Sequence, residues 1–208
     1  MKAMSYPGTL ASSFRDPSGF LFQRDGILYR QVNGTYREHY DALMKTGLYE
    51  ALVEKKMLVP HTEVSLAYEM PSAAYKIIKP QNIPFISYPY EWSFSQLKQA
   101  ALATLDIELV ALEYGLTLKD ASAYNIQFLD GKPLLIDTLS FEKYGPEEPW
   151  IAYRQFCQHF LAPLALMAYC DVRLNQLLRI YIEGVPLDLA SSLLPKRSWA
   201  ILGILMHI

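Results

Sequence analysis

The chain contains little cysteine, no long apolar run and no excess of positive charge. Its two cysteines, Cys157 and Cys170, lack C-x-x-C spacing and stand in apolar, helix-like surroundings. We therefore expect buried free thiols in a reducing, cytoplasmic compartment. The longest apolar run, residues 160–170, contains Pro163 and is too short to span a bilayer. The formal net charge of −2 gives no basic field, so we expect binding to neither nucleic acid nor membrane.

The most informative segment runs from Leu118 to Glu142 and contains a hairpin signal. Asp130-Gly131 separates two apolar runs, residues 126–129 and 133–136, as in a two-residue hairpin turn. Pairing back from this turn sets Asn125 opposite Ile136, which leaves Asn125 and Asp137 side by side at the open end. Asp120 lies five residues before Asn125, one loop away.

These three oxygen-bearing side chains suit Mg²⁺, a hard cation that takes oxygen ligands and often shares them with phosphates. The alternative is a surface hairpin in which the aspartate is a cap and the asparagine a turn residue.

The pattern D-x-x-x-x-N, hairpin, I-D resembles the catalytic and metal loops of the protein-kinase-like superfamily, which includes the aminoglycoside kinases. The resemblance implies that Asp120 orients or deprotonates an acceptor hydroxyl. It implies that Asn125 and Asp137 bind Mg²⁺ on ATP. Lys119 stands where that family has Arg or Gly, and it would orient the loop or neutralise charge.

The order of the expected elements agrees with this resemblance. A hairpin around Asp25-Gly26 comes first, then a helical region over 36–56 interrupted at Gly47, and then strands at 73–78 and 83–90. We expect the second strand to be an edge strand that leads into a hinge near 87–92. In that superfamily the backbone of this hinge holds adenine. We therefore expect an α+β, two-lobed kinase-like fold with a small lobe at 1–88 and a helical lobe at 89–208.

A long helix is expected to start at Ser93, which forms a capping box with Gln96, and to stop at Gly115. Its apolar face is expected to carry Phe94, Leu97, Ala101, Leu105, Leu109 and Leu112. After Pro149 the chain is expected to be mostly helical, with His159 on a polar face.

Three features of the expected small lobe stay open. Arg30 stands where a nucleotide-binding lysine would be, so it is the expected phosphate contact, with Lys76 and Lys79 as alternatives. Glu50 and Glu54 would be acidic partners of that cation or solvated surface charges. The turn at 16–19 is either a weak phosphate loop or an ordinary surface turn.

Several phrases, among them PFISYPYEWSFSQLKQAAL and LTLKDASAYNIQF, resemble the N-terminal region of bacterial class I S-adenosylmethionine-dependent methyltransferase family proteins, over residues 14–190. The resemblance implies that a methyltransferase domain using S-adenosylmethionine follows. This chain has no G-x-G loop between a strand and a helix, so that chemistry is expected in the missing domain. The uncapped apolar end at 199–208 also suggests more chain, and alone it is expected to fray or pack on another copy.

The sequence thus predicts a Mg-ATP-binding kinase-like domain, with transfer of phosphate to an unknown hydroxyl as its possible reaction. Ser122, where many kinases have Lys or His, and Arg30 favour the alternative of a degenerate module that regulates an attached methyltransferase. A methyltransferase fragment with no nucleotide site is the remaining alternative.

Overall fold

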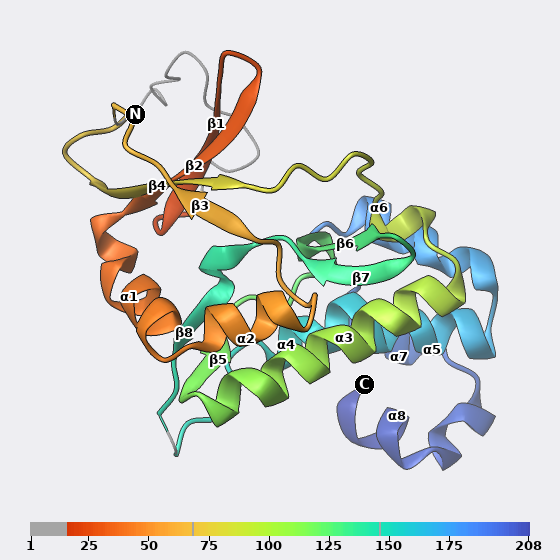
Figure 1. The fold of residues 1–208 in the computed structure, drawn as a ribbon. Helices are drawn as coiled ribbons and strands as arrows, with labels where there is room; N and C mark the ends of the chain where they lie inside the picture. The colour runs from red at the N-terminus through yellow and green to blue at the C-terminus, as the bar shows by residue number, and fades with distance from the viewer. Residues whose placement is uncertain (1–15, 68, 146) are drawn as a thin grey trace, which may run out of the picture.

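The computed structural model describes residues 16–67, 69–145 and 147–208, and it has a mixed α+β architecture (Figure 1). A four-stranded antiparallel sheet at the N-terminal end has the order β1-β2-β4-β3. Its strands are β1 (Gly19–Arg24), β2 (Ile27–Asn33), β3 (His61–Glu63) and β4 (Ala74–Pro80). The rest of the described chain is mainly helical, with two short strand pairs between the sheet and the helices.

Both D-G turns are confirmed. Asp25 and Gly26 have φ of 53° and 76°, and Asp130 and Gly131 have φ of 50° and 76°. Positive φ at both central positions is what a type I′ hairpin turn requires. The second turn joins β6 (Ile126–Leu129) to β7 (Lys132–Leu135), in the expected register with Leu129 opposite Lys132.

The helical region after β2 divides into α1 (Arg37–Lys45) and α2 (Leu48–Glu54), as the sequence predicted. Gly47 between them has φ of 86°, a left-handed conformation that glycine adopts without steric cost. Leu43, Leu48 and Leu52 are fully buried and belong to the same large core as α3. The core of the helical part therefore extends under α1 and α2.

Helix α3 (Phe94–Glu113) has the predicted capping box between Ser93 and Gln96, and Gly115 follows its end with φ of 74°. The predicted apolar face is partly wrong. Leu105 and Leu109 are 37% and 62% exposed, whereas Thr104 and Glu108 are buried. Because nearly every second residue of α3 is apolar, periodicity alone does not select the buried face; packing against its neighbours does.

Two small antiparallel pairs carry the central loops. Strand β5 (Leu116–Leu118) pairs with β8 (Phe141–Lys143), and the β6–β7 hairpin lies between them in sequence. A parallel bridge joins Leu58, after α2, to Leu135 at the end of β7. These contacts fix the loops after β5 and β7 relative to the sheet.

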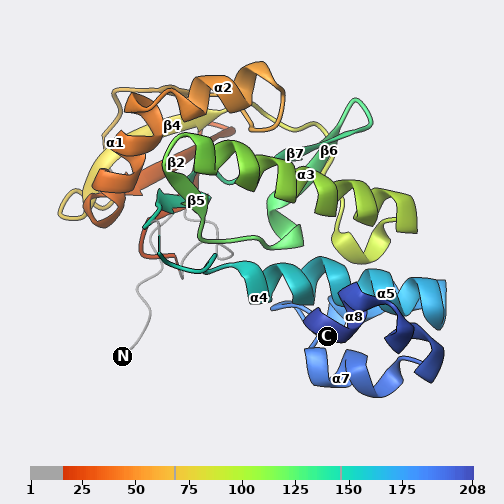
Figure 2. The same cartoon turned by 90° about the horizontal axis from the view of Figure 1, so that it is seen from below.

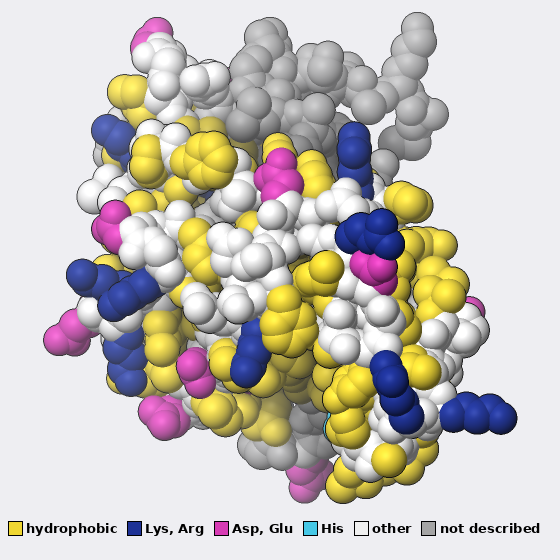
Figure 3. Space-filling view, turned by 90° about the vertical axis from the view of Figure 1, so that its right-hand side faces the viewer, with side chains coloured by type: hydrophobic (Ala, Val, Ile, Leu, Met, Phe, Trp, Pro, Cys, Tyr) yellow, Lys and Arg dark blue, Asp and Glu magenta, His cyan; other side chains and the backbone are white. Residues whose placement is uncertain are grey.

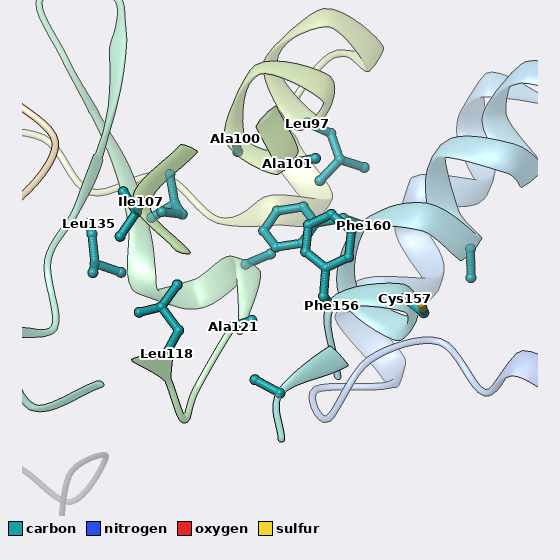
Figure 4. Packing of buried hydrophobic residues seen from close by; sticks show 14 of the residues in the cluster. Leu97, Ala100, Ala101, Ile107, Leu118, Ala121, Leu135, Phe156, Cys157 and Phe160 are labelled. Atoms are coloured by element: carbon teal, nitrogen blue, oxygen red, sulfur yellow. The ribbon is translucent and has the colours of Figure 1, made fainter. Parts of the chain in front are cut away.

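The C-terminal part consists of short helices stacked below α3 (Figure 2). They are α4 (Tyr153–Phe156), a π-helical segment (Cys157–Leu161), α5 (Ala162–Tyr169), α6 (Leu177–Ile180), α7 (Leu187–Leu193) and α8 (Leu202–His207). The rings of Phe156 and Phe160 lie close to α3 in the core (Figure 4), with their centroids 5.3 Å apart.

Two expectations for this part are corrected. Cys157 is buried as predicted, but Cys170 is exposed, because it follows the end of α5. His159 lies in the core with 1% exposure and is not on a polar face, since the π-helical turn shifts the register of the helix. The described tail forms α8, in which Ile204 is buried and Leu202, Leu205 and Met206 are exposed, and fraying or packing of this tail on another copy stays a prediction.

The expected strand at 83–90 is not formed. Residues 81–88 run as an extended linker, followed by a 3₁₀ turn at Pro89–Glu91. Pro84 and Pro89 remove two backbone donors, and β3 already pairs with the free edge of β4. Within the described part of the chain, none of the helices combines the length and apolarity needed to cross a membrane.

Candidate functional site

Arg30 on β2 and Asp137 after β7 form an ion pair at the junction of the sheet and the central loops. Nη1 of Arg30 donates to Oδ1 of Asp137 at 2.5 Å, and Nη2 is 3.4 Å from Oδ2. Arg30 is 8% exposed, because its strand lies in the middle of the sheet. Asp137 Oδ1 also accepts from the backbone N–H of Leu139 at 2.8 Å, which caps the 3₁₀ turn Thr138–Ser140. Both side chains are therefore held in place by the fold.

The turn before β1 closes over the same place. Asp16 Oδ2 accepts from Arg30 Nη2 at 3.2 Å, and Asp16 Oδ1 accepts from the backbone N–H of Ser18 at 2.8 Å. Ser18 Oγ in turn accepts from Lys119 Nζ at 2.6 Å. The two predicted cations, Arg30 and Lys119, are thus brought together through one short turn.

Lys119 is positioned by the β5–β8 pair and by an aromatic ring. Its backbone N–H donates to Ser140 O at 2.8 Å. Its Nζ lies 4.6 Å from the ring centroid of Tyr36, a cation–π distance. The Tyr36 hydroxyl donates to Phe141 O at 2.5 Å. Burial, and then the charge of Asp137, raise the pKa of Tyr36 well above its usual value, so this ring stays neutral.

Asn125 and Asp137 lie at the open end of the hairpin, as the register predicted. The backbone N–H of Ile136 donates to Asn125 O at 2.8 Å, which continues the β6–β7 pairing. Asn125 Nδ2 lies 3.4 Å from Ser140 Oγ, and this contact orients the amide. Among the described residues Asn125 Oδ1 has no hydrogen-bond partner, and Asp137 Oδ2 has only the 3.4 Å contact with Arg30. These are the two oxygens left for a ligand.

Hard oxygen donors of this kind fit Mg²⁺, which retains several waters and needs one or two protein ligands beside phosphate. Within residues 16–67, 69–145 and 147–208, no group of three His, Cys, Asp or Glu side chains could hold a metal by itself. Any metal at Asn125 and Asp137 would therefore share its coordination with a bound ligand and with water, and it would compete with Arg30 for Asp137.

Asp120 lies in the loop after β5, half-buried, and is held by two donors. Its Oδ1 accepts from the backbone N–H of Ser122 at 3.0 Å and from Gln155 Nε2 at 2.9 Å. Gln155 Oε1 accepts from the backbone N–H of Ala121 at 2.7 Å, so the glutamine clamps the loop. Nothing in the local sequence pattern around Gln155 indicates this contact with Asp120, 35 positions away.

The structure shows the contacts of the N-terminal residues whose roles the sequence left open. Arg30 takes Asp137 and Asp16 as its partners, whereas Glu50 and Glu54 are exposed on α2. Lys76 pairs with Glu63 on the neighbouring strand. Gly19 is required by close packing, because a Cβ there would lie 2.2 Å from Gln31 O and 2.8 Å from Leu139. The turn at 16–19 therefore packs tightly on β2 and on the loop after β7.

The expected hinge contains a contact that the sequence did not predict. Gln127 on β6 is 3% exposed and binds the linker through both polar atoms of its side-chain amide. Its Oε1 accepts from the backbone N–H of Ser87 at 2.9 Å, and its Nε2 donates to Ser87 O at 2.9 Å. The backbone N–H and C=O of Ser87 in the linker are therefore already hydrogen-bonded to a side chain of the same protein.

Glu108 is a second buried polar group that sequence reasoning missed. This side chain of α3 accepts from Thr117 Oγ1 at 2.6 Å and from the backbone N–H of Leu118 at 2.7 Å. Burial raises the pKa of Glu108 above its ordinary value. The carboxyl connects α3 to β5 and so supports the loop that carries Lys119 and Asp120.

Comparison with known proteins found no family model that matches the chain. The chain is 35% identical over 204 residues to nodulation protein NoeA of Rhizobium meliloti (strain 1021). The aligned region covers 97% of this chain and 42% of that protein. The chain is thus similar, over nearly its whole length, to a segment of a longer nodulation protein.

Proposed function

We propose that this chain is a kinase-like domain that binds Mg-ATP in a bacterial, cytoplasmic protein that also contains an S-adenosylmethionine-dependent methyltransferase domain. In this proposal residues 1–88 are the small lobe and residues 89–208 the helical lobe. The observation that carries it is the junction at which Arg30 meets Asp137, with an unpartnered oxygen of Asn125 at the same hairpin end. The order of sheet, linker, long helix, loop and hairpin supports it as well.

Each side chain has a role that its contacts support. Arg30 and Lys119 would bind phosphate oxygens, Arg30 through its planar fork and Lys119 as a point charge. Asn125 and Asp137 would hold the metal, which when bound neutralises phosphate charge. Asp120, oriented by Gln155 and Ser122, would accept the proton of an acceptor hydroxyl.

A second function is favoured by one specific observation. If the linker backbone held a nucleotide base, it would need free N–H and C=O groups, but Gln127 occupies both groups of Ser87. Together with Arg30 in place of lysine, this contact favours a degenerate module that binds a phosphorylated ligand weakly and regulates or presents substrate to an attached methyltransferase. A methyltransferase fragment without a nucleotide site is the third candidate.

Calorimetry of this chain with Mg-ATP, with ATP alone and with S-adenosylmethionine separates the three. We expect Mg-ATP to bind and to stabilise the fold by about 2.7 kcal/mol at 100 times its Kd. Asp137→Asn keeps one side-chain oxygen that can accept from Leu139 N–H and from Arg30, but it removes the negative charge that would bind the metal. The affinity for Mg-ATP should therefore fall roughly tenfold.

Asp106→Asn is the matched control, since Asp106 is an exposed residue of α3 for which no ion pair is seen in the described chain. This variant should bind Mg-ATP as the wild type does. No binding of ATP at millimolar concentration would remove the nucleotide proposal. Binding of S-adenosylmethionine to this chain would instead support the methyltransferase-fragment alternative.

A further inference from the structure

We propose that Arg30 and Lys119 form one anion site, and that Asp16 and Ser18 occupy it as an internal competitor for the phosphate groups of a ligand. The proposal concerns the same site as the proposed function and specifies how that site is regulated. The ligand class is a compound with two or more adjacent phosphates.

The two cations come from distant parts of the chain and converge on a single turn. Arg30 on β2 donates to the carboxylate of Asp16, and Lys119 after β5 donates to the hydroxyl of Ser18. Asp16 and Ser18 are themselves joined by a side-chain to backbone hydrogen bond of 2.8 Å. The turn therefore presents one charged and one neutral oxygen to two positive groups.

Arg30 retains donor capacity that the protein does not use. A guanidinium has five N–H donors in a planar fork. Here Nη1 and Nη2 contact Asp137 and Asp16, while Nε is buried and has no partner in the described chain. A buried unpaired donor costs free energy. A phosphate chain brings more acceptor oxygens than the single carboxylate oxygen that Asp16 supplies.

Lys119 has no counterion among the described residues. Within the described residues no carboxylate oxygen lies within 4.0 Å of its ammonium group, which contacts the Ser18 hydroxyl and the Tyr36 ring. A half-buried cation whose oxygen partner is uncharged attracts any anion that can displace the hydroxyl.

Asp16 is the partner that a ligand can displace most easily. Its side chain is 33% exposed, against 19% for Asp137, and its contact with Arg30 is 3.2 Å, against 2.5 Å. Ion pairs that are open to solvent contribute little to stability, because water and salt screen them. A multiply charged ligand should therefore replace Asp16 while Asp137 keeps its contact with Arg30.

Displacement does not require the turn to unfold. Pro17 O accepts from Asn33 Nδ2 at 3.1 Å and from Thr35 Oγ1 at 2.7 Å, and Ser18 O accepts from the backbone N–H of Asn33 at 2.8 Å. These bonds tie the backbone of the turn to β2 and the residues after it. Rotation of the Asp16 and Ser18 side chains is sufficient to free both cations.

The test is calorimetric titration with sodium tripolyphosphate, without divalent cations and at low ionic strength. Asp16→Asn removes the competing charge and keeps the oxygen that accepts from Ser18, so the turn is retained. We expect it to bind tripolyphosphate about fivefold more tightly than the wild type. Asp106→Asn, the same charge change on the far surface of α3, should leave the affinity unchanged. Lys119→Met should weaken binding in both the wild-type and the Asp16→Asn background.

Equal affinity of the wild type and Asp16→Asn for tripolyphosphate, or no binding by either protein, would overturn the proposed role of Asp16 as a competitor. A parallel titration with Mg-ATP keeps this result separate from the proposed function. If Asp16→Asn gains affinity for tripolyphosphate and neither protein binds Mg-ATP, the result supports the anion site and overturns the proposed nucleotide function. If Mg-ATP binds and the affinity for tripolyphosphate does not depend on Asp16, the result overturns the role of Asp16 as a competitor and supports the proposed nucleotide function.

Discussion

At the scale of single residues, the candidate site is assembled from side chains of the turn before β1, of β2 and of the loops after β5 and β7. The aspartates and the asparagine between Leu118 and Glu142 stand out because of their spacing around a D-G turn. The structure brings Arg30 to Asp137 and Lys119 to the turn that contacts Arg30. The partners Asp16 and Gln155 could not be derived from spacing, since they approach from other elements.

Asp120→Asn tests the base role of Asp120. Asparagine has nearly the same shape and can still accept from Ser122 and Gln155 through its oxygen, so the loop should keep its conformation. If the chain transfers phosphate, the rate should fall by about 10²–10⁴-fold, because a positioned general base is lost. The measurement is phosphate transfer or ATP hydrolysis at saturating Mg-ATP, with the binding affinity determined beside it. Equal turnover in both proteins would exclude the base role.

At the scale of elements, one buried glutamine binds the backbone of the linker between β4 and α3. The linker has little regular structure, and Phe85 and Tyr88 on it are 75% and 45% exposed. Figure 3, which views the molecule from the right-hand side of Figure 1, shows hydrophobic side chains interspersed with charged ones over much of this face. The two hydrogen bonds from Gln127 to the backbone of Ser87, together with the one from Trp92 Nε1 to Ser87 Oγ, hold this segment in place.

We expect Gln127→Leu to lower the free energy of unfolding by about 1–3 kcal/mol, because the Ser87 N–H and C=O lose their partners. Hydrogen exchange of the Ser87 amide should become faster at the same time. Gln23→Leu is the control, since Gln23 is an exposed residue of β1 and its loss should change stability by less than about 0.5 kcal/mol. Unchanged protection of Ser87 in Gln127→Leu would show that the contact does not hold the linker.

At the scale of the whole molecule, the half-buried His61 and the buried His159 make the free energy of unfolding depend on pH in the acid range. Burial lowers the pKa of His61 and of His159 from 6.5 to about 4. Because the folded pKa is below the unfolded one, the folded state favours the neutral ring. The resulting stability is fully present above pH 6.5 and is lost as the pH falls toward 4. His159 Nδ1 has no partner in the described chain, so protonation there gains no compensating hydrogen bond.

Each of these histidines should add up to about 1.4 kcal/mol per pH unit to the slope of stability between pH 6.5 and 4. His159→Leu removes one titrating group, so denaturant unfolding followed across this range should show a shallower slope. Gln23→Leu, at an exposed and non-titrating position on β1, serves as the control and should keep the wild-type slope. An identical pH profile for His159→Leu and the wild type would contradict the assignment.

The sequence by itself determined the local features of this protein: two D-G hairpins, the break at Gly47, the capping box at Ser93 and the register that brings Asn125 beside Asp137. These follow from backbone preferences and hydrogen bonds within a few residues. Only the tertiary structure decided which face of α3 is buried, that residues 83–90 form no strand, that His159 lies in the core and that Asp16 reaches Arg30. Each of these depends on packing between segments far apart in the chain. Such contacts do not follow from the periodicity or the residue propensities of the local sequence.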